Sequence, residues 1–226
     1  MSYITILKKL SITMAGSVAT IGVLASSSHA ATLGIYTLDN TLSASSVNSN
    51  LIFSNFSYTG TATPTFVIDN NTPVGQAYSA SKWSTNSNLT NYFSFTITPK
   101  AGYNMTLDSI KLDEQRSATG IRNWQIRSSL DNYATSIATF NLLDNTTWRS
   151  DQTTNLNSLF SNLNSAVQFR IYGYNSESTS GTWRVDDVKV NGSVLSVATI
   201  PEPRTILGLL TVTGLTVAMK RQKSNS

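Results

Sequence analysis

Apolar and polar residues alternate through most of the segment between Ala31 and Ala198. The clearest alternating stretches are Tyr92–Pro99, Asn123–Ser129 and Ala166–Gly173. A period of two is the spacing of side chains on one face of a β-strand. Clusters of Ser, Asn, Gly and Asp separate the stretches and supply turns. The pattern therefore predicts an all-β fold, an antiparallel β-sandwich or jelly roll.

The remaining elements belong to the same domain, residues 31–198, which is long enough to bury a core without disulfides. Further strands are expected at Thr32–Leu38, Leu51–Tyr58, Thr65–Asp69, Ser109–Gln115, Thr135–Phe140, Thr182–Val190 and Ser193–Ala198. One segment breaks the alternation, because Leu156, Leu159, Phe160 and Leu163 recur at helical spacing. They predict one short helix of two to three turns that packs an apolar stripe on the sandwich.

The residue types that are missing exclude several classes of chemistry. The chain has no cysteine and one histidine, His29, which lies in a segment expected to be removed. This excludes Ser-His-Asp and Cys-His catalysis, disulfide frameworks, and metal sites with His or Cys ligands. The net charge of +4 comes from the two ends, since residues 31–200 hold ten basic against eleven acidic residues. We therefore expect no nucleic-acid partner.

Residues 1–30 have the three parts of a secretory signal peptide. Met1–Lys9 carries two lysines, Leu10–Ala25 is apolar or small without charge, and Ser26–Ala30 ends in small residues. Signal peptidase accepts small side chains there, so we expect cleavage after Ala30 and export of the mature chain. An uncleaved anchor is the alternative, but the apolar stretch is short for a span of about 20 residues.

The C-terminal segment, residues 199–226, has the composition of a short membrane anchor. The tripeptide Pro201-Glu202-Pro203 precedes the uncharged run Thr205–Met219, and the basic segment Lys220–Lys223 follows. A helix over the uncharged run would span roughly 22 Å, short of a ~30 Å hydrocarbon core. Basic residues after the span hold that end in the cytoplasm. The segment therefore predicts a folded domain that is held outside by a short transmembrane helix.

This segment resembles the PEP-CTERM sorting signal of exported bacterial proteins. The resemblance rests on Pro201, Glu202 and Pro203, on the apolar run, on the basic end and on the N-terminal signal. It implies recognition by the membrane transpeptidase exosortase, cleavage near the tripeptide, and a place at the cell surface or in the extracellular matrix, often among exopolysaccharide. A plain single-span anchor is the alternative. The stretch Tyr92–Gly192 also looks like a recurrent β-sandwich ectodomain of PEP-CTERM proteins.

Asp186 and Asp187 stand where the alternation slips, between Val185 and Val188. Such a slip predicts a β-bulge, which would turn one carboxylate inward. A calcium ion with oxygen ligands would stabilise an inward carboxylate. The last strand also loosely resembles the closing strand of carbohydrate-binding jelly rolls, which implies a structural calcium ligated by an aspartate. The alternative is that Asp186 faces solvent and Asp187 pairs with a Lys or Arg.

Four outward residues, Arg127, Arg170, Tyr172 and Arg184, would share one sheet face if their strands are neighbours. Guanidinium groups and aromatic rings suit sugars, through hydrogen bonds to hydroxyls and stacking on the ring. Arginine also suits the carboxylates of acidic polysaccharides. These residues predict a glycan-binding face, and an ordinary solvated face is the alternative.

Three functions follow from these patterns. The first is an exported, non-enzymatic surface or matrix protein that contacts exopolysaccharide, and the second is a purely structural matrix or envelope protein. The third is a surface polysaccharide hydrolase, which needs two carboxylates about 5–9 Å apart. Glu114 is a poor acid for that role, because an arginine at Arg116 would lower its pKa. Trp124 and Trp183 are expected in the core instead of in a ligand site.

Overall fold

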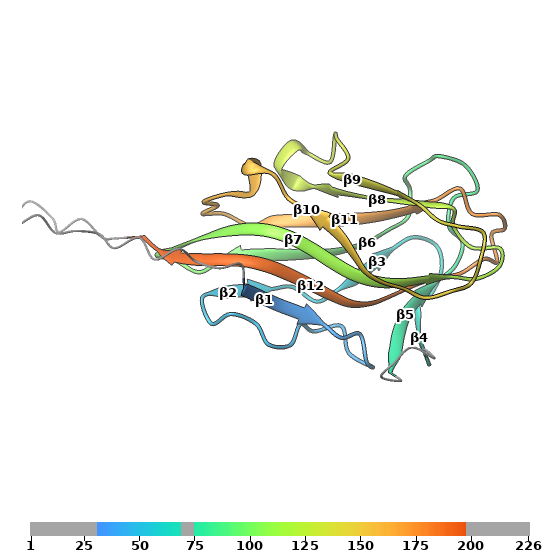
Figure 1. Ribbon diagram of the computed structural model, residues 1–226, viewed down its shortest axis with the longest axis horizontal. Coiled ribbons are helices and arrows are strands. Elements are labelled where there is room, and N and C mark those ends of the chain that lie inside the picture. Colours follow the sequence, from blue (N-terminus) through green and yellow to red (C-terminus); the bar gives the residue numbers. More distant parts are fainter. Residues whose placement is uncertain (1–30, 69–74, 198–226) are drawn as a thin grey trace, which may run out of the picture.

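The computed structural model describes residues 31–68 and 75–197. Two antiparallel β-sheets pack face to face in this part of the chain, and the only helices there are two single 3₁₀ turns (Figure 1). The predicted antiparallel β-sandwich is confirmed. The expected signal peptide, residues 1–30, and the expected sorting signal, residues 199–226, lie outside the described residues. No helix within the described ranges is long and apolar enough to span a membrane.

Sheet A is built around two long strands that pair over most of their length. Its order is β10 (Arg149–Asn155), β7 (Tyr103–Arg116), β12 (Trp183–Ser196), β5 (Gln76–Ala80) and β4 (Thr65–Ile68), and β1 (Ala31–Tyr36) pairs with β12. Because β1 pairs with the middle of β12, the first and last described strands lie side by side (Figure 1).

Sheet B has three central strands with regular register. Its order is β2 (Leu51–Phe53), β6 (Tyr92–Pro99), β11 (Val167–Tyr174), β8 (Asn123–Ser128) and β9 (Ala138–Asn141), and β3 (Ser57–Thr59) pairs with β6. Phe169 on β11 faces Phe95 on β6, and Ile171 faces Ile126 on β8. These apolar positions point inward, so the residues between them form the outer face of sheet B.

Aromatic rings fill the core between the sheets. Trp83, Trp124 and Trp183 are almost completely buried. The Trp183 ring centre lies 5.4 Å from that of Trp83, 5.9 Å from that of Trp124 and 5.4 Å from that of Phe93. The core positions expected for Trp124 and Trp183 are therefore confirmed. Such aromatic pairs add stabilisation beyond the burial of their surface.

Strand boundaries differ from expectation where the chain leaves the hydrogen-bonded ladder. The expected strand Leu51–Tyr58 divides into β2 and β3, because Phe56 turns into the core and its amide donates to Leu42 O (2.7 Å). The expected strands at 182–190 and 193–198 are one strand, β12, with a register shift beside Gly192. A side chain at Gly192 would meet Thr106 O at 2.1 Å, so the bulge requires glycine there.

The expected helix around Leu159 is reduced to one 3₁₀ turn, η2 (Ser158–Phe160). Asn157 begins the turn by accepting a hydrogen bond from the amide of Leu159, and Asn162 has a positive φ of 56°. Phe160 is buried as expected, but Leu159 is 67% exposed. The helical spacing was therefore misleading, because asparagines that favour caps and left-handed backbone interrupt the segment.

Two charged residues of β7, Glu114 and Arg116, face the core and are fully buried. Glu114 accepts hydrogen bonds from Trp183 Nε1 (2.8 Å) and from Arg149. Arg116 pairs with Asp144 (2.7 Å) and Glu177 (2.8 Å). The expected lowering of the Glu114 pKa is wrong. Burial raises the pKa of Glu114, and the hydrogen bond and charge of Arg149 offset only part of that effect.

Candidate functional site

The outer face of sheet B brings together three of the four residues predicted to contact glycan. Arg170 on β11 lies directly opposite Arg127 on β8, and Tyr172 follows two positions along β11 on the same face. Arg184 lies in sheet A, where its Nη1 donates to Gln115 Oε1 (2.8 Å). The four side chains therefore do not share one face, because β12 belongs to the opposite sheet.

Two tyrosine rings lie against the guanidinium group of Arg170. Its central carbon lies 3.7 Å from the ring centre of Tyr133 and 4.6 Å from that of Tyr92. Tyr92 comes from β6, and Tyr133 comes from the loop between β8 and β9. We call Tyr92, Tyr133, Gln168, Arg170 and Tyr172 the Arg170 cluster. Sequence reasoning missed Tyr92 and Tyr133, since only the strand register and the loop path bring them to Arg170.

Hydrogen bonds fix the geometry of the Arg170 cluster. Gln168 Oε1 accepts bonds from Tyr133 Oη (2.6 Å) and Arg170 Nε (3.3 Å), and Tyr172 Oη accepts one from Arg170 Nη1 (3.5 Å). Tyr172 is only 5% exposed, and its ring centre lies 5.0 Å from that of Tyr92. Tyr172 therefore supports the other rings from below, whereas Tyr133, Tyr92 and Arg170 reach the surface.

Arg127 positions the loop that carries Tyr133. Its Nη1 donates to the backbone carbonyls of Tyr133 (2.8 Å) and Ala134 (3.1 Å). Asn132 and Tyr133 both have left-handed backbone, with φ of 55° and 61°. This conformation is unfavourable for a tyrosine, and the surrounding contacts hold it. Arg127 thus acts on the site through Tyr133.

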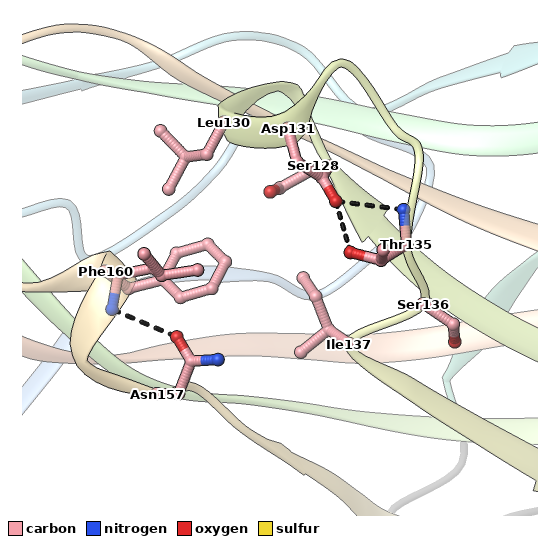
Figure 2. A pocket seen from close by; sticks show the side chains of 9 residues that line it. Ser128, Leu130, Asp131, Thr135, Ser136, Ile137, Asn157 and Phe160 are labelled. Atoms are coloured by element: carbon pink, nitrogen blue, oxygen red, sulfur yellow. Dashed lines mark hydrogen bonds between the residues drawn. The ribbon is translucent and has the colours of Figure 1, made fainter.

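The same loop forms one wall of a pocket of about 340 Å³ (Figure 2). The pocket lies between this loop and η2, and its lining residues are Ser128, Leu130, Asp131, Thr135, Ser136, Ile137, Asn157, Leu159 and Phe160. Asp131 Oδ2 accepts hydrogen bonds from the Thr135 hydroxyl and from Thr135 N (2.9 Å), which closes the loop (Figure 2). The wall of the pocket therefore also fixes the path of the Tyr133 loop.

The pocket holds a single carboxylate, that of Asp131. Hydrogen bonds from Thr135 lower the pKa of Asp131, which is the opposite of what a general acid needs. A second pocket, between the residues that follow β3, β5 and the β11–β12 loop, is lined by Thr61, Ser81, Lys82, Thr179, Ser180 and Thr182. It has no carboxylate in its lining. Neither pocket offers the pair of acids that glycoside hydrolysis requires.

The structure contains the bulge predicted at Asp186 and Asp187, since the register with β7 shifts between Asp186 and Lys189. Asp187 has a φ of 45° and pairs with Lys189 (3.3 Å). Asp186 lies on the outer face beside Asp113 at only 8% exposure, and its carboxylate accepts the amide of Asp187 (2.8 Å). No group of three or more acidic or His/Cys residues that could hold a metal occurs among the described residues.

No protein-family model and no curated protein matches the sequence. Solved structures that match include a *Clostridium thermocellum* xylanase with CBM22-1 and GH10 modules, complexed with xylohexaose. It has 13% identity and a TM-score of 0.39, over 64% of this chain and 27% of that chain. A tandem CBM22-1–CBM22-2 domain from *Paenibacillus barcinonensis* has 9% identity and a TM-score of 0.46, over 79% of this chain and 49% of that chain.

A third match is the K1 cleaved adhesin domain of Lys-gingipain from *Porphyromonas gingivalis*, with 8% identity and a TM-score of 0.40. This match covers 72% of the present chain and 98% of the adhesin domain. The chain spans about a quarter of the length of the xylanase structure and about half of the tandem domain. Similarities this distant carry no argument about ligand or activity, so the functional argument rests on the Arg170 cluster.

Proposed function

We propose that this protein is an exported, non-enzymatic surface or matrix component that contacts polysaccharide through the Arg170 cluster. The observation that supports this proposal is the position of the Arg170 guanidinium over the rings of Tyr133 and Tyr92. Rings and a guanidinium held in this way offer apolar stacking faces and N–H donors at one place. Sugar rings need both, because one side of a sugar is apolar and its edge carries hydroxyls.

The position of the cluster also supports a polymer as the ligand. The cluster lies on the outer face of sheet B and lines neither of the two pockets described above. Beside β11 this face also presents the hydroxyl of Thr96 on β6, whereas Ser94 and Gln125 are only 5% and 7% exposed. A polysaccharide chain can lie across such a face, whereas a small molecule binds better in a closed cavity.

Loss of the stacking residues is expected to weaken polysaccharide binding. In gel-retardation assays with a panel of soluble polysaccharides, Tyr133→Ala and Arg170→Ala should each raise the Kd about tenfold, since interface aromatic and arginine residues carry 1–2 kcal/mol or more. Arg184→Ala is the matched control, because Arg184 is an arginine on the opposite sheet with a neutral partner. A panel that contains no retarding polysaccharide would contradict the proposal and leave a purely structural matrix protein.

The proposed export and surface localisation rest on the two terminal segments. We propose that signal peptidase removes residues 1–30, and that exosortase recognises Pro201, Glu202 and Pro203. The surface-extracted protein is then expected to lack the segment after the tripeptide, which the intact mass measures. A mass that still includes Thr205–Ser226 would contradict processing and favour a plain single-span anchor.

A further inference from the structure

We infer that the polysaccharide is anionic and that the edge of the Arg170 guanidinium pairs with a uronic-acid carboxylate. This inference rests on the proposed function, since it names the ligand class of the same cluster. It follows from the charge of the outer face of sheet B, from the partners of Arg170, and from the orientation that the two tyrosine rings impose on it.

The partners of Arg170 are all uncharged. Its hydrogen bonds go to Gln168 and Tyr172, and its central carbon lies over the rings of Tyr92 and Tyr133. Three other arginines, by contrast, have carboxylate partners: Arg116, Arg122 and Arg149. Within residues 31–68 and 75–197, neither Arg170 nor Arg127 belongs to an ion pair. No carboxylate within these ranges therefore pairs with the positive charge of Arg170.

The strand positions around Arg170 add positive charge and no negative charge. On the neighbouring strands Arg170 lies opposite Ser94 and Arg127, and the next outward positions are Tyr92, Thr96 and Gln125. The adjacent loop contains one acidic residue, Asp131. Its Oδ2 accepts a hydrogen bond from the amide of Thr135 in the wall of the 340 Å³ pocket. Strand positions with two arginines and no carboxylate carry a net positive charge and attract anions. A face of balanced ion pairs would attract them far less.

The hydrogen bonds of Arg170 leave one nitrogen at the edge of its guanidinium for a ligand. Nε and Nη1 already donate within the cluster, whereas Nη2 donates to no group in the described part of the chain. A guanidinium edge matches the two oxygens of a planar carboxylate, and charge-assisted bonds of this kind are stronger than those to hydroxyls. The rings also hold the group in one orientation before the ligand arrives, which lowers the entropy cost of binding.

The test compares one polymer with and without its charge. The full chain is run by affinity gel electrophoresis in four gels without calcium. One gel contains polygalacturonate, and the others contain its methyl ester, neutral xylan and dextran sulfate. Wild type should bind polygalacturonate at least tenfold more tightly than the methyl ester. Arg170→Ala should remove most of that difference, Arg170→Lys should restore part of it, and Arg184→Ala should leave it unchanged. The Arg184 control also accounts for non-specific attraction by the basic terminal segments.

The outcomes separate this inference from the proposed function. Equal binding of polygalacturonate and its methyl ester, with Arg170→Ala weakening both, would overturn the anionic ligand while retaining a glycan site. Tighter, Arg170-dependent binding of dextran sulfate would overturn the carboxylate in favour of a sulfate ester. Absence of binding to all four polymers would overturn the proposed function as well. Unchanged thermal unfolding of each variant shows that the fold is intact.

Discussion

Replacement of Trp183 by alanine is expected to lower the free energy of unfolding by about 3–5 kcal/mol, the usual cost of removing a buried aromatic side chain. The Trp183 ring, on sheet A, contacts those of Trp124 and Phe93 on sheet B and that of Trp83, which follows β5. Its removal would leave a cavity at the centre of the sandwich. The buried carboxylate of Glu114 would also lose the hydrogen bond that it accepts from Trp183 Nε1.

Denaturant unfolding measures this loss, and Trp148 provides the matched control. Trp148 is only partly buried and has no ring partner among the described residues. Trp148→Ala is therefore expected to cost much less than Trp183→Ala. Equal losses in the two variants would contradict the central role of the Trp183 cluster.

Replacement of Glu114 by alanine is expected to cost a similar amount, about 3–5 kcal/mol, because it removes one partner of a buried ion pair. The side chain of Arg149, which is only 16% exposed, would lose the Glu114 carboxylate as its partner. The buried Trp183 Nε1–H would lose its hydrogen-bond acceptor. Glu177→Ala is the control with the same residue change. It should cost less, since Glu177 is partly exposed and Arg116 keeps Asp144.

The pH dependence of a Glu114→Gln variant tests the same site. The folded-state pKa of Glu114 is raised above its ordinary value of 4.5, so the folded state holds a proton that the unfolded state releases. The contribution of Glu114 to stability is therefore greatest below pH 4.5 and is lost as pH rises through the folded pKa. Glutamine does not titrate. The stability of the variant relative to wild type should thus increase as pH rises from about 4.5, and a decrease would contradict the raised pKa.

Much of the fold follows from the sequence, because half-buried strands show their alternation directly. The expected strand Tyr92–Pro99 agrees with β6 at both ends, and Asn123–Ser129 differs from β8 by one residue. The strands that escaped prediction, β5 and β10, lack this signal. β10 is a polar edge strand that pairs only with β7, and β5 is short and buried on both faces. Alternation reports a strand only where one face is buried and the other is not.

The candidate site was less predictable than the fold, since its residues meet through strand order and not through spacing. The alternation along each strand predicts the outward positions of Arg127, Arg170 and Tyr172. It does not predict which strands lie next to each other, and Arg184 shows the same outward pattern in the opposite sheet. Tyr133 carries no strand signal at all, because a loop with left-handed backbone brings it to Arg170. A loop path of this kind depends on tertiary hydrogen bonds such as those from Arg127.

The pairing of β12 has a mechanical consequence under the proposal that the C-terminal segment holds the protein at a surface. β12 runs from Trp183 to Ser196 between β7 on one side and β5 and then β1 on the other. Tension along this strand would load the flanking hydrogen bonds in shear, so that many resist together instead of opening one by one. Force that enters through the tail would therefore be spread over sheet A, while the Arg170 cluster on sheet B stays outside the loaded strands.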